Sequence, residues 1–263
     1  AITNRAIGKH EKASGRKVGE WIAPADSRVV HLNGGVVVKG KLYCAHSNWP
    51  LQPLKNTVEI WETETLRHID TVAFNAGSGA LTWVDYRQGT WWAGVSFYGE
   101  VKSVGKTYVT RLDDHWKTGP KWTFPAKVIR RFAPYANSGA SFGPDGLLYA
   151  TGHDHGEVFA LRVPREPGGL ELVDVLPMGI EGQGICWDRF DLGVLYGIHR
   201  PKKAVVVARL SHDQEYKTLA ASIAWERHEE NPVLPPRKGD FFDIGRCMNP
   251  WVVRVGDEYR LYY

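Results

Sequence analysis

The sequence predicts an all-β fold, a single five-bladed β-propeller domain spanning residues 1–263, on two repeated features. Gly-rich turns that lead into apolar runs begin at residues 33, 77, 137 and 182, so they recur at intervals of 44, 60 and 45 residues. A Leu-Tyr pair opens a short apolar strand at Leu42, Leu148, Leu195 and Leu261. Four strands in each unit of roughly 40 to 50 residues is the period of a propeller blade.

The strands of each unit follow from alternating, β-branched and aromatic runs bounded by turn residues. Two strand-like pieces, 1–6 and 17–22, precede the first Gly-rich turn. The first unit is expected to hold strands 35–38, 41–45, 57–61 and 68–74. The second is expected to hold strands 81–84, 90–95, 107–112 and 121–124, with an insertion at 98–106 that explains its greater length.

The third unit opens at Asn137 and contains a Gly-Pro-Asp-Gly turn at 143–146, a strong hairpin signal. Its outer strands are expected at 157–163 and 171–176, and those of the fourth unit at 194–198, 204–210 and 222–225. The segment 215–229 has the one helical pattern, which Ser222-Ile223 weakens.

The two ends of the chain are expected to share the last blade. Segments 251–255 and 258–263 read as two strands joined by a Gly-Asp turn, and the chain then stops half a blade short. The two amino-terminal strands supply the missing half. Such closure removes exposed sheet edges, which would otherwise invite aggregation.

The bulk composition is that of an ordinary globular protein, with 43% apolar and 24% charged residues. A net charge of +4 with scattered basic residues argues against nucleic acid as the partner, and no apolar run is long enough to span a membrane. The three cysteines form no metal spacing and read as small buried thiols. The chain begins at Ala1, as a mature form after signal removal or a shortened chain would, and we expect a secreted or periplasmic location.

Histidines follow the second strands of several units. In a propeller, the loop before the first strand and the loop after the second project from one end of the channel, here called the mouth. Imidazoles gathered there could bind a divalent metal, with Gln183 or Asp154 completing the shell, or act as acid and base near neutral pH. The residues expected at the mouth are Gly34, Ser78, Ser138 and Gln183 before the first strands, and His46, Ser96, His153, His155 and His199 after the second.

The alternative for each histidine is structural, because a histidine at a strand end often only caps a loop. We nevertheless take His46, His153 and His199 as the candidate catalytic residues and add His155 to them as possible metal ligands. Asp154 and Glu157 flank the His153–His155 pair and could orient it, although loop carboxylates are usually only solvated.

Aromatic residues are numerous, with eleven Trp and eleven Tyr. We expect Trp49, Trp91, Trp92, Tyr98 and Trp187 at or near the mouth, where sugar rings could stack on them, and Trp61, Trp83, Trp122 and Trp225 between the blades as core. Arg200 and Lys202 beside His199 would suit a carboxylate or sulfate group, and a charged rim is the alternative.

The tail resembles the opening blade of five-bladed propeller glycosidases, the clan of arabinanases, xylosidases and fructosidases. The matching stretches are 231–234, 249–253 and 257–263. Asn249 stands where that clan has its base or nucleophile Asp, and Asn can take neither role. The resemblance therefore implies the fold and a carbohydrate substrate but transfers no catalytic residue. The other blades loosely resemble propeller lyases and hydrolases that use channel histidines, some with a metal held by His and Gln.

The leading functional hypothesis is a hydrolase or lyase acting on a carbohydrate or related polyhydroxy substrate at the mouth. His46, His153, His155 and His199 would supply acid–base or metal-ligand groups; Trp49, Gln183 and Arg200 would bind substrate. The first alternative is a lectin-like propeller without catalysis. The second is a scaffold for protein partners, which would expose an apolar patch instead of a polar funnel.

Overall fold

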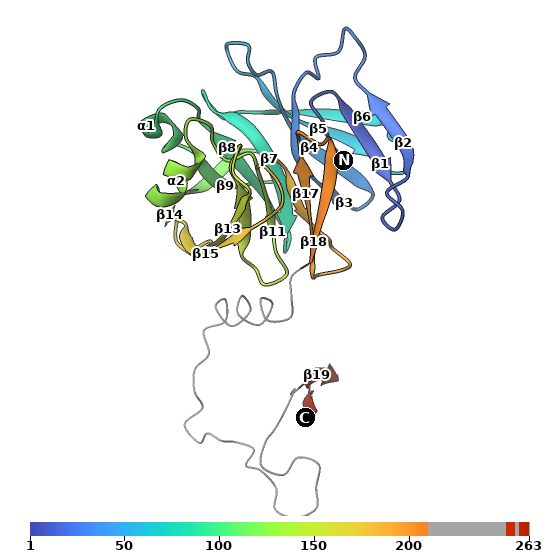
Figure 1. Ribbon diagram of the computed structural model, residues 1–263, viewed down its shortest axis with the longest axis vertical. Helices are drawn as coiled ribbons and strands as arrows, with labels where there is room; N and C mark the ends of the chain where they lie inside the picture. Colours follow the sequence, from blue (N-terminus) through green and yellow to red (C-terminus); the bar gives the residue numbers. More distant parts are fainter. Residues whose placement is uncertain (210–250, 256–257, 263) are drawn as a thin grey trace, which may run out of the picture. The chain divides into compact units, whose positions relative to one another are not determined.

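The computed structural model describes residues 1–209, 251–255 and 258–262. The chain divides into two compact units, residues 1–222 and 223–263, each of which is described by itself. The described residues of the first unit form five separate sheets (Figure 1). Those of the second form one hairpin, β19 (Trp251–Val255) and β20 (Glu258–Tyr262), where the sequence predicts two strands.

Four of the sheets in the first unit are propeller blades, and each is an antiparallel meander in chain order. Blade 1 is β3 (Leu32–Val38), β4 (Lys41–Ser47), β5 (Asn56–Glu62) and β6 (His68–Phe74). Blade 2 is β7 (Ala80–Arg87), β8 (Thr90–Ser96), β9 (Tyr108–Leu112) and β10 (Thr118–Thr123). Blade 3 is β11 (Gly139–Phe142), β12 (Leu148–Thr151), β13 (Glu157–Arg162) and β15 (Glu171–Pro177). Blade 4, as far as it is described, is β16 (Ile185–Trp187), β17 (Val194–His199) and β18 (Ala204–Arg209).

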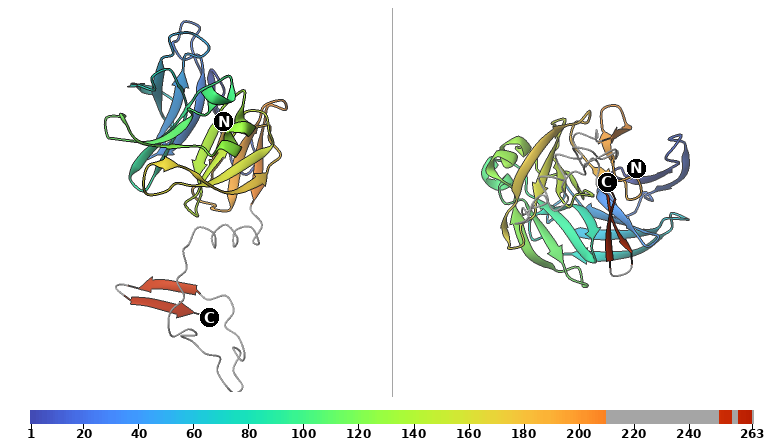
Figure 2. Two further views of the ribbon diagram at one scale, coloured as in Figure 1. Left: turned by 90° about the vertical axis from the view of Figure 1, so that its left-hand side faces the viewer. Right: turned by 90° about the horizontal axis from the view of Figure 1, so that it is seen from below.

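The innermost strands β3, β7, β11 and β16 pack against one another in that order, so the four blades surround a common centre (Figure 2, right). A short strand from blade 3's third connection, β14 (Gly168–Gly169), adds to the outer edge of blade 2 by pairing with β10 in parallel. The all-β propeller arrangement expected from the repeat is thereby confirmed for four blades.

Tight hairpins with positive φ join the inner strands of blades 1 and 2. Lys39 and Gly40 have φ of 47° and 76°, and Gln88 and Gly89 have φ of 48° and 80°. Two consecutive residues with positive φ make the type I′ turn whose twist matches that of paired strands. The Gly at the second position carries no steric cost there, which is why these hairpins are as short as the sequence suggests.

The additional length of the second repeat is divided between two places. The helix α1 (Val101–Val104) lies inside the expected insertion at 98–106, between β8 and β9. A second helix, α2 (Ala126–Phe132), lies between β10 and β11, where the sequence analysis expects no insertion. The helix is held in this position by its apolar side chains Val128, Ile129 and Phe132, which are buried in the core.

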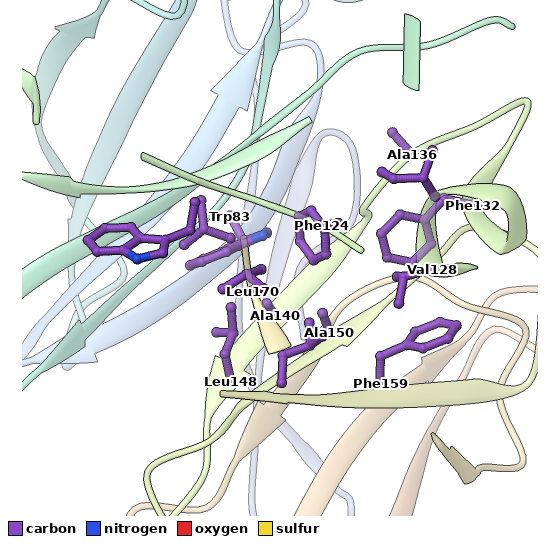
Figure 3. Packing of buried hydrophobic residues seen from close by; sticks show 14 of the residues in the cluster. Trp83, Phe124, Val128, Phe132, Ala136, Ala140, Leu148, Ala150, Phe159 and Leu170 are labelled. Carbon is purple, nitrogen blue, oxygen red and sulfur yellow. The ribbon is translucent and has the colours of Figure 1, made fainter. Parts of the chain in front are cut away.

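The largest core lies between blades 2 and 3 under helix α2 (Figure 3). Phe132 of α2 packs edge-on against Phe124, at 5.3 Å between ring centroids, and against Phe159 of β13, at 5.5 Å. Trp83 and Trp122 are fully buried in the same cluster, and Trp61 of β5 is fully buried in the cluster that blade 1 shares with the amino-terminal hairpin. The expected core role of these three tryptophans is confirmed; Trp225 lies outside the described residues.

The amino-terminal hairpin lies beside blades 1 and 4. It consists of β1 (Ala6–His10) and β2 (Lys17–Ile22), so the first strand begins at Ala6 instead of ending there as predicted. The strand starts later than predicted because the residues before it form a turn, in which the Thr3 hydroxyl bonds to the Ala6 backbone. Lys9 donates to the Glu64 carbonyl of blade 1 at 3.3 Å, and Lys12 forms an ion pair with Asp188 of blade 4.

Several expectations concern residues outside the described part: the helical pattern at 215–229, the strand at 222–225, Cys247 and Asn249. Cys44 is a buried free thiol and Cys186 a partly buried one, as expected. Burial raises the pKa of the Cys186 thiol to about 11, so it is protonated at neutral pH. No helix among the described residues is long and apolar enough to cross a membrane.

Candidate functional site

The predicted mouth is built by the loops at one end of the four inner strand pairs. The turns before β7, β11 and β16 carry Ser78, Ser138 and Gln183, and the ends of β8 and β17 carry Ser96 and His199. Antiparallel pairing of the first and second strands in each blade places these positions at the same end. The placement of the predicted residues therefore follows from the blade repeat.

His153 is the centre of a polar cluster at this end. Its Nδ1 lies 2.5 Å from Asp154 Oδ1, and its Nε2 lies 2.9 Å from the Arg200 Nη1 of blade 4. A guanidinium can only donate, so Nε2 accepts from Arg200 and Nδ1–H donates to Asp154. The carboxylate thus fixes both the tautomer and the orientation of the imidazole. The Arg200 Nη2 also lies 3.8 Å from Asp154 Oδ1, so the three side chains contact one another.

Tyr135 and Gln183 complete the surroundings of His153. The Tyr135 ring stacks on the imidazole at 4.0 Å between centroids. Gln183 has φ of 83°, and its Nε2 donates to the His153 carbonyl over 3.5 Å. The Thr151 hydroxyl donates to the Gln183 carbonyl at 2.5 Å, which ties the opening turn of blade 4 to the end of β12. Sequence reasoning missed Tyr135; its position two residues before the third Gly-rich turn is the signal that could have found it.

Gly182 is needed for this close contact between blades. Its φ is +67°, and a Cβ at this position would lie 2.4 Å from the His153 carbonyl carbon. An alanine would clash with backbone that cannot move aside as a side chain can. The Gly-rich turn of the fourth repeat is thus explained by the His153 cluster as well as by the turn itself.

The other two loop histidines lie near this cluster in sequence but have different partners. His199 ends β17, and its Nδ1 accepts from the Lys202 backbone N–H at 3.3 Å. His155 is exposed, and its carbonyl accepts from the Glu157 N–H at 2.9 Å. Glu157 itself pairs with Arg131 at 2.8 Å, so it does not orient the histidines as suggested.

His46 does not have the exposed position expected of a site residue. The side chain is buried, with only 4% of its surface exposed. Its Nε2 accepts from the Val30 N–H at 3.2 Å, and its Nδ1 bonds to the Thr57 hydroxyl at 2.8 Å. Thr57 in turn donates to Glu59 at 2.5 Å. Both ring nitrogens are therefore engaged, and the geometry gives His46 a structural role in blade 1.

The four histidines are consequently not assembled into one metal site. Across residues 1–209 and the second-unit hairpin, no three His, Cys, Asp or Glu side chains are arranged to hold a metal ion. The reason is local: His46 is turned into the blade, and the two nitrogens of His153 are taken by Asp154 and Arg200. The expected metal shell of His46, His153, His155 and His199 gains no support from this arrangement.

Protonation of His46 should make the protein less stable in mild acid. Burial lowers the pKa of His46, and its neighbour His31 lowers it further, against the opposing effect of Glu59. The unfolded chain then binds a proton that the folded chain does not, so stability falls as the pH drops below the ordinary histidine pKa. The His46→Gln variant should lose this slope between about pH 7 and pH 5 in denaturant titrations. An unchanged slope, or equal flattening in the exposed-residue control His115→Gln, would contradict the assignment.

Of the aromatic residues expected at the mouth, two are exposed in mouth loops. Trp49 follows β4 and is 44% exposed; Tyr98 follows β8 and is 38% exposed. Their ring centroids are 6.3 Å apart. Trp187 and Trp92 are buried core residues instead, because they face neighbouring blades. Trp91 is the second residue of β8, at the end opposite the mouth.

Comparison with known proteins gives structural neighbours alone. No family model matches the sequence, and no curated protein matches it. A PQQ-bound aldose sugar dehydrogenase from Streptomyces coelicolor is 13% identical, with a TM-score of 0.46; 80% of this chain and 72% of that one are covered. A putative oxidoreductase (glucose dehydrogenase) from Thermus thermophilus is 15% identical, with a TM-score of 0.45 and coverages of 80% and 75%.

The Pan2 WD40 domain from Neurospora crassa is also similar in structure. It is 10% identical, with a TM-score of 0.40, and the match covers 80% of this chain and 57% of that chain. WD40 repeats form propeller blades. At these identities the similarity concerns the arrangement of the sheets and carries no assignment of activity.

Proposed function

We propose that this protein is a carbohydrate-active enzyme, a hydrolase or lyase, whose site is the His153 cluster at the propeller mouth. The observation that supports it is the pairing of His153 with Asp154 and Arg200, beside the ring of Tyr135. An imidazole oriented by a carboxylate is a common arrangement for proton transfer near neutral pH. A ring surface and a guanidinium beside it suit a sugar that carries an anionic group.

In this proposal His153 carries the proton and Asp154 holds its tautomer. Arg200 occupies Nε2 in the free protein, and we propose that it turns to the anionic group of the substrate and releases that nitrogen. Gln183 holds the loop of His153 from blade 4 and offers its amide oxygen to a hydroxyl. His199, half-buried beside Arg200, is the second candidate for proton transfer.

The test compares His153→Gln with His155→Gln, two neighbouring loop histidines of which only the first lies in the cluster. Each variant is incubated with a panel of neutral and uronate-containing polysaccharides. New reducing ends report cleavage, and the ultraviolet absorbance of an unsaturated product separates lyase from hydrolase. Loss of a general acid or base should slow turnover by about 100-fold or more in His153→Gln and leave His155→Gln near the parent rate. Turnover that survives in His153→Gln would overturn the assignment; binding without any turnover by the parent protein would favour the lectin-like alternative.

In the second version of this proposal, the enzyme uses a divalent metal bound at the mouth. Metal content of the purified protein is measured directly, for the parent and for the His153→Ala and His199→Ala variants. A stoichiometric metal that is lost in both variants would place the ion at the mouth. A metal-free parent protein that still cleaves its substrate would assign the chemistry to His153 and its partners alone.

For the fold, we propose that the ring has five sectors and that the amino-terminal hairpin β1–β2 belongs to the fifth. Its contacts with Glu64 of blade 1 and Asp188 of blade 4 support this position. In the sequence prediction, the strands at 251–255 and 258–263 are the other two strands of the same blade. A chain ending at Arg209 should then have a lower Tm than the full chain. An unchanged Tm of the first unit would show that the carboxyl-terminal hairpin is not part of the ring.

A further inference from the structure

The mouth carries two groups of side chains that together extend from blade 1 to blade 4. Trp49 and Tyr98 lie 6.3 Å apart between ring centroids, on the loops that follow β4 and β8. At the other end, Tyr135 stacks on His153 at 4.0 Å, and His153 bonds to Arg200 at 2.9 Å. Each of these residues belongs to a loop at the same end of the blades.

A backbone hydrogen bond joins the two groups. The Gly99 N–H, next to Tyr98, donates to the Pro134 carbonyl, next to Tyr135, at 2.8 Å. The loops that carry the two tyrosines are therefore held against each other. Trp49, Tyr98, Tyr135, His153 and Arg200 are thereby brought together along adjoining loops, and we call this set the mouth row.

The row has exposed aromatic surface along most of its length. Trp49, Tyr98 and Tyr135 are 44%, 38% and 40% exposed, whereas the tryptophans of the core are fully buried. Burial raises the pKa of Tyr98 to about 12, so its phenol remains a neutral donor throughout the working pH range. Flat, neutral rings of this kind suit the apolar faces of pyranose rings better than they suit ions.

The one arginine of the row lies at its blade 4 end. Arg200 is 52% exposed and provides five N–H donors, of which the contacts to His153 and Asp154 use only part. Lys202 follows two residues later, on the same loop. The guanidinium geometry is suited to a carboxylate or sulfate held by two parallel hydrogen bonds.

We infer that the mouth binds an extended acidic oligosaccharide, a uronate-containing chain several sugars long, along the whole row. Its anionic group lies at Arg200, and sugars farther along the chain stack on Tyr135, Tyr98 and Trp49. This inference rests on the proposed function, because it uses the His153 cluster as the reactive end. It adds a substrate class and a remote binding subsite that the cluster alone does not require.

The experiment measures binding by calorimetry with uronate oligosaccharides of two and of six sugars, and with a neutral hexasaccharide. Trp49→Ala should weaken hexamer binding about tenfold, the loss of one aromatic stacking contact, and leave dimer binding unchanged. Arg200→Met should weaken both acidic ligands. Phe190→Ala, which removes a 93% exposed ring from the loop after β16 at the far end of the blades, is the matched control and should change neither.

Four outcomes separate the two proposals. An unchanged Kd for the hexamer in Trp49→Ala would overturn the row and leave the His153 site standing. Equal affinity of the parent for the neutral and the acidic hexamer would overturn the acidic class. Equal weakening of dimer and hexamer in Trp49→Ala would reveal a general structural effect and also count against the row. No binding of any oligosaccharide by the parent would overturn the proposed function and the inference together.

Discussion

Replacing Trp83 with alanine is expected to lower the free energy of unfolding by about 5 kcal/mol, the largest effect of any substitution proposed for this protein. Trp83 is fully buried in the core between blades 2 and 3. Its Nε1–H donates to Asn137 Oδ1 at 2.5 Å, across the blade boundary. Truncation therefore leaves a cavity and an unpaired buried amide oxygen together.

The packing around Trp83 leaves little room for the structure to relax. A Cβ added to Gly94 of β8 would lie only 2.0 Å from the Trp83 Nε1, so the indole sits directly on that glycine. Rigid surroundings preserve the cavity and increase its cost. At about 2–4 °C per kcal/mol for a protein of this size, the Tm should fall by about 10 °C or more.

Two further variants divide this effect into its parts. Trp83→Phe keeps most of the buried area but leaves Asn137 Oδ1 without its donor, which should cost about 1–3 kcal/mol. Trp116→Ala removes a half-buried indole whose ring lies tilted against Trp91, at 4.6 Å between centroids, and stacks on Tyr43 of blade 1. Because Trp116 is only partly buried, its loss should cost less than either core variant. Chemical denaturation measures all three. Equal losses for Trp116→Ala and Trp83→Ala would show that full burial between blades 2 and 3 does not give Trp83 the larger contribution to stability.

Much of this architecture could be predicted from the repeats. The Leu-Tyr and Gly-rich patterns indicate which residues are buried and where the chain turns, and both are local properties. The predicted bounds of strands such as β6 and β8 agree with the structure to within one residue. The burial of Trp61 and Trp83 could also be predicted, because each lies within a predicted strand. The hairpin at Gln88-Gly89 is visible because positive φ demands particular residues.

The direction in which a strand-end histidine points is not a local property. His46 and His153 occupy corresponding ends of second strands, yet His46 is buried against Thr57 and His153 is turned toward Arg200. The difference comes from neighbours outside each strand: Val30 donates its N–H to His46, while Gln183 of the next blade donates to the His153 carbonyl. Sequence alone could place both histidines at one end of the blades and could not assign their roles.

An ion pair between the buried Asp85 carboxylate and the partly exposed Arg189 links blade 2 to blade 4, and breaking it should have the second largest effect. Arg189, after β16, lies 2.5 Å from Asp85 Oδ1 of β7, and Asp85 is 1% exposed. The Phe142 N–H of blade 3 donates to the other carboxyl oxygen at 2.8 Å. Three blades therefore meet at one carboxylate. Removal of one partner from such a pair costs about 3 kcal/mol or more, because the other charge stays buried and unpaired.

The expected result for Arg189→Met is a loss of about 3 kcal/mol near neutral pH that becomes smaller in acid. Burial raises the pKa of Asp85, and Arg189 and the backbone donors act against this. Without Arg189 the folded pKa rises further above its unfolded value, so the folded chain binds the proton first. Stability of the variant should then increase as the pH falls through the raised pKa, the opposite of the His46 effect.

The matched control is Arg209→Met, which breaks an arginine–aspartate pair of similar length, 2.6 Å to Asp191, on the exposed side of blade 4. Exposed pairs contribute about 1 kcal/mol at most, so the two arginines should differ clearly in denaturant titrations. The double variant Asp85→Asn with Arg189→Met should recover part of the loss, because the amide has no charge to leave unpaired and can still accept from Phe142. If the loss of stability in the double variant equals the sum of the losses in Asp85→Asn and Arg189→Met, the two side chains act independently. The link between blades 2 and 4 would then have to lie in the packing of β7, β11 and β16 instead of in the ion pair.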